Sequence, residues 1–177
     1  MLKGKRNEED ALKDFMNWVG NLPMVAHNAK FDISFIEMAF DKYKDEVMLK
    51  PGVLRLLEYC KKNGIKMGIA TSNSRELMNV IAKTHGISEY ISCIKTGSDI
   101  TNGKPAPDIY LAVADKLAVS PEECLVFEDI TAGIIAGKNA GMKVCAVEDD
   151  YSMHQTEDKK RLADYYIKDY YDIELRG

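Results

Sequence analysis

The chain has 177 residues, 46% of them hydrophobic and 29% charged, with a formal net charge of −4. These values are typical of one soluble globular domain, and the acidic balance argues against a broad nucleic-acid surface. The sequence contains neither an apolar run of about 20 residues nor a secretory signal, so we expect a cytoplasmic protein without a membrane segment. Its four cysteines are far apart within apolar runs, which favours free thiols over disulfides or a metal cluster.

The first part of the chain predicts a helix, a short strand and a second helix. Residues 11–20 carry apolar side chains on one helical face. A short apolar strand follows over 23–27, and the second helix runs from Asn28 to about Tyr43. The pattern therefore indicates a helix–strand–helix unit at the start of the chain.

The rest of the chain alternates between helical and strand patterns. Apolar periodicity predicts helices over 51–60, 74–85 and 107–117, a further helix of small residues before Gly141, and strands over 65–70, 90–95, 124–127, 143–147 and 163–167. The segment 149–161 is polar and has no clear period. This alternation predicts an α/β fold, a three-layer Rossmann-like parallel sheet with helices on both faces.

Two adjacent carboxylates, Glu128 and Asp129, follow the strand predicted over 124–127. A helix and then another strand come next, so both carboxylates lie at the carboxyl end of a strand. Ligands bind at this edge of open α/β sheets, and Mg²⁺ prefers one or two carboxylates together with phosphate oxygens. We therefore expect this pair to hold Mg²⁺ rather than to be ordinary surface acids.

A hydroxyl-rich turn and a lysine precede the acidic pair. Thr71, Ser72 and Asn73 follow the strand over 65–70, and the helix that begins after them offers free N–H groups to an anion. Lys104 stands in a turn that two prolines stiffen. We expect these residues to bind phosphate. The alternatives are that Thr71 is a helix N-cap and that Lys104 is a solvated loop residue.

Three motifs in this order resemble those of the haloacid dehalogenase-like (HAD-like) hydrolases, in particular the phosphatase and phosphomutase branch. They are Ile69-Ala-Thr-Ser-Asn73, Gly103-Lys-Pro-Ala-Pro-Asp-Ile-Tyr110 and Val126-Phe-Glu-Asp-Ile-Thr-Ala-Gly133, and the resemblance runs from about Lys44 to the C-terminus. It implies a HAD-like fold in which Thr71 binds the transferring phosphoryl group and Lys104 neutralises its charge. Glu128 and Asp129 would hold Mg²⁺, and the substrate would be a small phosphorylated metabolite.

The chain departs from that family pattern before Lys44. The family's first motif is an apolar strand that ends in Asp-x-Asp-Gly-Thr, whose first Asp is the nucleophile, and the sequence does not contain it. The helical cap domain that usually follows this motif is missing too. Because covalent phosphoryl transfer needs an in-line nucleophile, we expect a core that binds phosphate and Mg²⁺ but has impaired turnover.

Residues 1–43 instead resemble part of a DEDD-type 3′–5′ proofreading exonuclease. The segment Val25-Ala-His-Asn-Ala-Lys-Phe-Asp-Ile-Ser-Phe35 is similar to the second motif of that family, which implies that Asp32 is a metal ligand. The Asp-x-Glu of that family is missing. His154 and Asp158 miss its His-x4-Asp spacing by one residue, so we interpret them as part of an exposed polar turn. One carboxylate cannot hold the two metal ions of such a nuclease.

We therefore interpret residues 1–177 as one composite domain, with an exonuclease-like segment over 1–43 and a HAD-like core over 44–177. The apolar strand at 24–27 is our candidate to fill the central sheet position of the missing motif. Asp32 is the candidate for a substitute nucleophile, and a solvated or capping role is its alternative. The origin of the junction and the oligomeric state stay open.

Three functions remain open. The first is a Mg²⁺-dependent HAD-type hydrolase of phosphate monoesters whose nucleophile is absent or substituted. The second is an inactive chimeric or truncated protein that still binds Mg²⁺ and phosphate. The third is a remnant of a 3′–5′ exonuclease that binds DNA ends, which the missing carboxylates and the acidic net charge rank last. The sequence does not identify the substrate.

Overall fold

The computed structural model describes residues 48–175. The chain divides into two compact units, Met1–Met48 and Leu49–Gly177, and the elements described here belong to the second. The helix–strand–helix unit predicted at the start of the chain lies outside the described residues. The single-domain arrangement and the junction near residue 43 therefore stay predictions.

Helices and strands alternate along the described residues, as the apolar periodicity predicts. In chain order the elements are α3 (Val53–Lys62), β1 (Gly68–Thr71), α4 (Arg75–Thr84), β2 (Cys93–Thr96), α5 (Asp108–Leu117), β3 (Leu125–Glu128), α6 (Thr131–Asn139), β4 (Lys143–Val147), α7 (Thr156–Leu162) and β5 (Tyr165–Ile167). Five short 3₁₀ helices, η1 to η5, lie at Ile87–Glu89, Gly97–Asp99, Pro121–Glu123, Asp150–Gln155 and Tyr170–Asp172. The polar segment 149–161, for which the sequence has no clear period, forms η4 and α7. None of the helices between residues 48 and 175 combines the length and apolarity needed to cross a bilayer.

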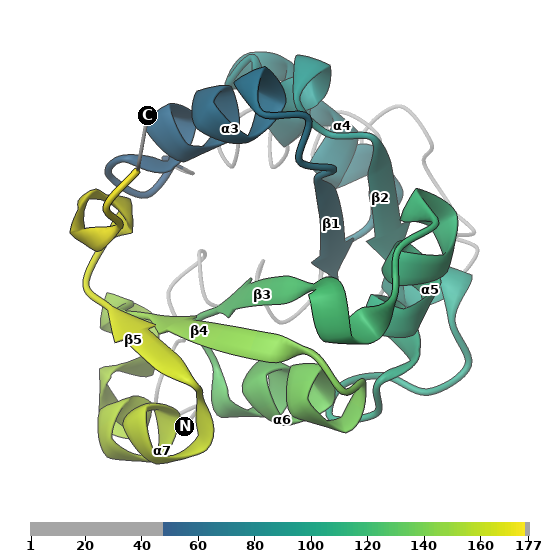
Figure 1. Cartoon of the computed structure of the whole chain (residues 1–177). Coiled ribbons are helices and arrows are strands. Elements are labelled where there is room, and N and C mark those ends of the chain that lie inside the picture. Colours follow the sequence, from purple (N-terminus) through teal and green to yellow (C-terminus); the bar gives the residue numbers. More distant parts are fainter. Residues whose placement is uncertain (1–47, 176–177) are drawn as a thin grey trace, which may run out of the picture. The chain divides into compact units, whose positions relative to one another are not determined.

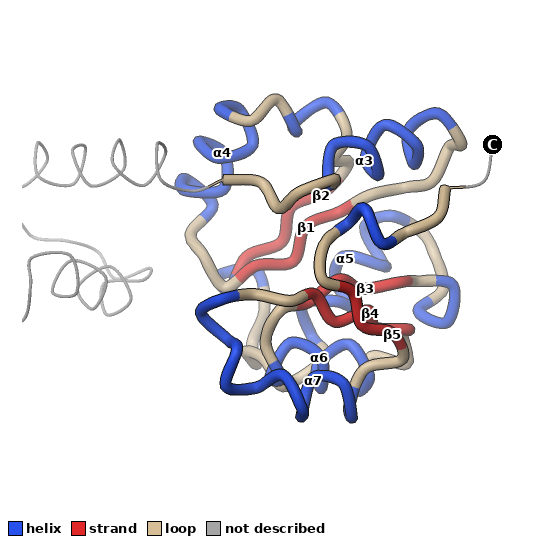
Figure 2. Tube along the Cα trace, turned by 90° about the vertical axis from the view of Figure 1, so that its left-hand side faces the viewer, coloured by secondary structure: helices blue, strands red, loops and turns tan. Residues whose placement is uncertain are grey.

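Among the described residues the strands form two groups of parallel strands, in agreement with the predicted parallel α/β class. β1 pairs with β2, with Gly68 opposite Cys93, and β3, β4 and β5 form the second sheet in that order. α5 packs on β1 and β2, whereas α6 and α7 lie on the same side of the second sheet (Figures 1 and 2). Among the described residues no strand joins β1 to β3. The strand predicted to fill that place, at 24–27, lies outside them.

Small residues in α6 allow this helix to pack closely on β4. Ile134 and Ala136 of α6 are fully buried, as are Val144 and Ala146 of β4. A Cβ atom at Gly137 would stand 2.7 Å from Cγ2 of Val144, so a larger residue would push the helix away from the strand. The small-residue sequence of α6 therefore keeps the helix close to β3 and β4.

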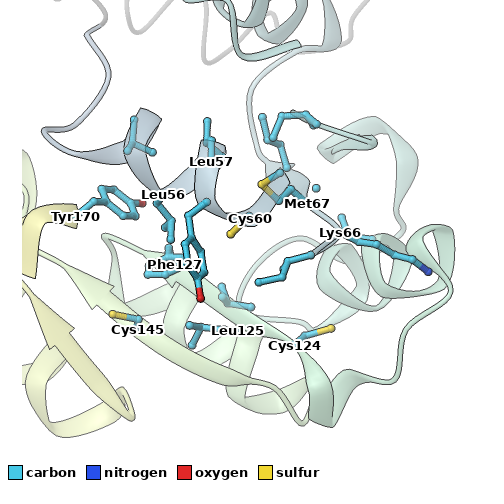
Figure 3. A pocket seen from close by; sticks show the side chains of 18 of the residues that line it. Leu56, Leu57, Cys60, Lys66, Met67, Cys124, Leu125, Phe127, Cys145 and Tyr170 are labelled. Carbon is cyan, nitrogen blue, oxygen red and sulfur yellow. The ribbon is translucent and has the colours of Figure 1, made fainter. Parts of the chain in front are cut away.

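An apolar cavity of about 1130 Å³ lies among α3, β1 and the β3–β5 sheet. Leu57 and Cys60 of α3 and Phe127 of β3 contribute to its wall (Figure 3). The apolar face of α3 borders this space, and accordingly the helix has no fully buried residue. None of the candidate phosphate- or metal-binding residues of the described chain lines the cavity, so the candidate site lies elsewhere.

The four cysteines are free thiols, as their spacing predicts. Cys93 and Cys145 are buried, whereas Cys60 and Cys124 are half-buried. Burial raises the pKa of Cys145 to about 11. Its sulfur is therefore a protonated packing group at neutral pH rather than a reactive thiolate.

The N-terminus of α4 is capped by Ser74 and not by Thr71, which corrects one of the alternatives above. Ser74 Oγ accepts a hydrogen bond from the N–H of Leu77, with 3.3 Å between the two atoms. We expect Ser74→Ala to lower the free energy of unfolding by about 1 kcal/mol, because that N–H loses its partner, and Ser74→Asp to retain it. Denaturant unfolding measures the difference, with Ser72→Ala at an exposed position of the same turn as control. Equal losses in the two alanine variants would contradict the assignment.

Candidate functional site

A buried ion pair joins the proline-rich turn to the carboxyl end of β3. Lys104 stands in the turn before α5, and its Nζ pairs with Oε1 of Glu128, the last residue of β3. The two side chains keep only 11% and 8% of their surface exposed. Two buried charges are stable only when they are paired and hydrogen-bonded further, so this contact needs another polar partner.

Tyr110 of α5 supplies that partner. Its hydroxyl donates to Glu128 Oε1, and Lys104 Nζ lies 5.2 Å from the centroid of its ring. Burial, followed by the negative charge of Glu128, raises the pKa of Tyr110 well above its usual range, so the hydroxyl remains a donor. On its other side the carboxyl group of Glu128 lies directly against Gly133 of α6, at a place where a Cβ atom would overlap it.

The next residue, Asp129, has a different environment. Burial, and then the negative charges of Glu128 and Asp149, raise the pKa of its half-buried carboxyl group. Lys50 opposes this shift but forms its own ion pair with Asp149, in which Nζ is 2.6 Å from Oδ2. Among the described residues Asp129 itself is in none of the ion pairs. A carboxylate close to two other acids and without a cationic partner favours a bound cation.

The acidic residues of the described chain suit Mg²⁺ better than a metal ion whose ligands all come from protein side chains. Between residues 48 and 175 no group of three His, Cys, Asp or Glu side chains could hold a metal ion. Mg²⁺ does not need such a group, because it keeps several waters and takes one or two carboxylates together with phosphate oxygens. Asp129 meets this requirement, whereas Oε1 of Glu128 is engaged by Lys104 and Tyr110. The assignment of both acids to Mg²⁺ stays a prediction, with Asp129 the better placed.

The hydroxyl-rich turn after β1 is not linked to this ion pair. Thr71 ends β1, and its Oγ1 accepts a hydrogen bond from the N–H of Asn73 at 3.1 Å, whereas Ser72 and Asn73 are exposed. Among the hydrogen bonds and ion pairs of the described residues, none connects these three to Lys104 or the acidic pair. Their phosphate-binding role stays a prediction. Asp32, the candidate nucleophile and metal ligand, lies outside the described residues.

Comparison with known proteins identifies the family. A sequence model of the haloacid dehalogenase-like hydrolases matches residues 8–147. The chain belongs to the haloacid dehalogenase-like hydrolase family. The putative phosphatase YhcW of Bacillus subtilis is 39% identical to this HAD-like chain over 108 residues, which are 61% of the chain and 49% of that protein. The probable pseudouridine-5'-phosphatase of Drosophila melanogaster is 34% identical over 128 residues, covering 66% of the chain and 55% of that protein.

A solved structure agrees with this membership. The HAD hydrolase of family IA, variant 3, from Entamoeba histolytica matches with a TM-score of 0.68 and 27% identity, over 98% of this chain and 77% of that one. The predicted HAD resemblance and the α/β class with parallel strands are therefore confirmed. The chain spans about half the length of the two curated relatives described above.

The family match also includes most of the segment that resembles an exonuclease. It begins at residue 8, well inside the segment 1–43. HAD-like sequence therefore extends through a part of the chain for which we expect a different origin. The relatives described above give no support to the exonuclease resemblance, and the composite origin of the chain stays a prediction.

Sequence reasoning did not identify Tyr110 or the residues that hold the backbone of Asp129. Apolar periodicity predicts the helix that carries Tyr110, which is confirmed, but does not reveal that its hydroxyl reaches the buried ion pair. Ser152 Oγ donates to the carbonyl oxygen of Asp129 at 2.6 Å, and Lys159 Nζ donates to the same oxygen at 3.2 Å. Both belong to the polar segment 149–161, whose lack of period gave no signal.

A side chain at Gly133 is incompatible with the present position of Glu128. In Gly133→Ala the new methyl group would overlap the Glu128 carboxyl group, so we expect that group to move away from Lys104. The free energy of unfolding should fall by about 1–3 kcal/mol, as for other overpacked sites. Gly97→Ala is the matched control, because its Cβ would have its nearest neighbour, the carbonyl oxygen of Ser72, at 3.8 Å. Equal denaturant unfolding curves for the two variants would contradict this prediction.

The raised pKa of Asp129 makes the stability of the protein depend on pH. The folded state binds the Asp129 proton more tightly than the unfolded chain, so stability falls as pH rises from the ordinary Asp value of about 3.9 through the folded value. Asp129→Asn cannot ionise. Without divalent cations it should therefore melt at a higher temperature than the parent at pH 7, with the difference vanishing below about pH 3.5.

Thermal unfolding over a series of pH values measures this effect. The control is Asp158→Asn, which removes an exposed acid of α7 whose Oδ1 pairs with Arg161 at 2.7 Å. A lower melting temperature for Asp129→Asn than for the parent at pH 7 would show that the carboxylate is stabilised, and not destabilised, by its surroundings.

Proposed function

We propose that this chain acts on small phosphate monoesters with Mg²⁺, as a hydrolase of the haloacid dehalogenase-like class. The observation that supports this most directly is the buried pair of Lys104 and Glu128, which fixes a lysine at the end of β3 that leads into Asp129. A lysine and an uncompensated carboxylate at one strand end suit a phosphoryl group and its metal ion. Membership of the family and relatives named as phosphatases support the same reaction class.

Each side chain has a distinct task in this proposal. Asp129 offers carboxylate oxygens to Mg²⁺, which when bound would neutralise charge on the phosphoryl oxygens. Lys104, held in place by Glu128 and Tyr110, would neutralise further negative charge on the same group. Thr71 and the N–H groups that follow it would bind the remaining phosphoryl oxygens.

Covalent phosphoryl transfer also needs a nucleophile. Of the two carboxylates at the end of β3, Glu128 is engaged by Lys104, and Asp129 is proposed to bind the metal. The Asp-x-Asp-Gly-Thr motif of the family does not occur in the sequence. We therefore propose that turnover by this chain alone is impaired and that Asp32 is the residue to test as a substitute nucleophile. Binding of Mg²⁺ and phosphate without turnover is the alternative function.

Release of phosphate from a small aryl phosphate by the full chain tests the proposal. We expect slow turnover that requires Mg²⁺ and falls by about 100-fold or more in Asp129→Asn, because the metal loses its protein carboxylate. Asp158→Asn, which removes an exposed acid of the same charge, should behave like the parent. Turnover that depends neither on Mg²⁺ nor on Asp129 would rule the proposal out.

Further measurements on the same proteins separate the alternatives. Loss of turnover in Asp32→Ala would identify that residue as the recruited nucleophile. Calorimetric binding of Mg²⁺ and inorganic phosphate without any turnover would favour the binding protein. Shortening of single-stranded DNA from its 3′ end would instead favour the exonuclease remnant.

A further inference from the structure

Three side chains that follow β4 hold the turn between β3 and α6. Ser152 of η4 donates to the carbonyl oxygen of Asp129 at 2.6 Å, and Lys159 of α7 donates to the same oxygen at 3.2 Å. Oε1 of Gln155 accepts from both the N–H and the hydroxyl of Thr131, at 2.9 Å in each case. One short segment therefore binds the turn on both sides of Ile130.

Lys159 is the most buried of the three, with none of its surface exposed. Its Nζ donates to the carbonyl oxygens of Asp129 and Val147, each at 3.2 Å, and to Ser152 Oγ at 3.0 Å. An ammonium group has three N–H donors, and these three neutral oxygens match them. A buried ammonium is tolerated only where its donors are satisfied, so these contacts fix the side chain in one position.

The contacts of Lys159 also tie β3 to β4. Val147 is the last residue of β4, and Asp129 follows the last residue of β3, so one ammonium links the carboxyl ends of two neighbouring strands. The carbonyl group of Asp129 cannot rotate without breaking its bonds to Ser152 and Lys159. Because this carbonyl and the carboxylate share one Cα atom, fixing the carbonyl restricts the directions that the carboxylate can take.

We propose that Ser152, Gln155 and Lys159 form a positioning bracket that sets the direction of the Asp129 carboxylate for cation binding. This inference rests on the proposed function, in which Asp129 holds Mg²⁺. The three residues follow residue 147, where the match to the family ends, so the bracket lies outside the matched family pattern. None of them is a catalytic residue, because all three act through the backbone of the acidic turn.

The affinity for Mg²⁺ distinguishes positioning from a simple effect of charge. Removal of a positive charge near an acidic site by itself strengthens cation binding, whereas loss of positioning weakens it. We expect Lys159→Met in the full chain to bind Mg²⁺ about 10- to 100-fold more weakly than the parent in calorimetry. Ser152→Ala should show a smaller loss in the same direction, because one of the two bonds to the carbonyl remains.

Lys160→Met is the matched control. It removes the same charge from the neighbouring position of α7, but Lys160 is exposed, with Nζ 3.4 Å from Oε1 of Glu157 and 5.3 Å from the ring centroid of Tyr166. The Lys160→Met variant should bind Mg²⁺ as tightly as the parent or slightly more tightly. Equal or tighter binding by Lys159→Met would overturn the proposal.

A second readout needs neither metal nor turnover. The ¹³C′ chemical shift of Asp129 responds to the hydrogen bonds that its carbonyl oxygen accepts. We expect this shift to change in Ser152→Ala and to stay at the parent value in Lys160→Met. Ser152→Ala removes a single hydroxyl, so it provides the test if Lys159→Met does not fold.

The two readouts also keep the inference separate from the proposed function. If the parent does not bind Mg²⁺, the proposed function fails, while the chemical shift still decides whether the bracket holds the carbonyl. An unchanged Asp129 shift in Ser152→Ala would overturn the bracket, even if Asp129 proves to bind the metal.

Discussion

Burial of the Lys104–Glu128 pair requires four parts of the chain to meet at one point. The proline-rich turn provides the lysine, β3 provides the carboxylate, α5 adds the hydroxyl of Tyr110, and α6 offers the bare Cα of Gly133. Removing one partner of a buried pair costs about 3–5 kcal/mol, because the remaining charge is left without compensation. The four segments are therefore energetically coupled, because displacement of any one of them would disturb the buried ion pair.

The two adjacent acids, Glu128 and Asp129, have different surroundings in the fold, although the sequence Glu-Asp does not show this difference. Glu128 is the last residue of β3 and Asp129 is the first residue after it. Glu128 meets a lysine and a phenol, and its charge is used to hold the fold. Asp129 meets burial and the charge of Asp149, and it remains available for a ligand of opposite charge. The same motif thus contains one acid that is paired within the fold and one that, among the described residues, is in no ion pair.

Apolar periodicity was sufficient to predict a helix or strand where the buried face of that element consists of apolar side chains. In α5, Ile109, Tyr110 and Ala114 are buried at helical spacing, and the helix was predictable. In α7 the sequence Thr-Glu-Asp-Lys-Lys-Arg-Leu has no apolar stripe, and the buried residue is Lys159. Lysine is almost never buried without partners, so no local rule predicts a helix with a lysine on its inner face.

Residues outside the motif contact the acidic turn and the acid that lies next to it. Lys50 donates to the carbonyl oxygen of Glu148 and to the carboxylate of Asp149, and so limits the negative charge around Asp129. Lys159 approaches the same turn from the helix after β4 and binds its carbonyl oxygen. One lysine therefore acts on the electrostatic field at the carboxylate, and the other acts on its backbone. The motif identifies the family, whereas the contacts that hold the acidic turn come from side chains that no motif contains.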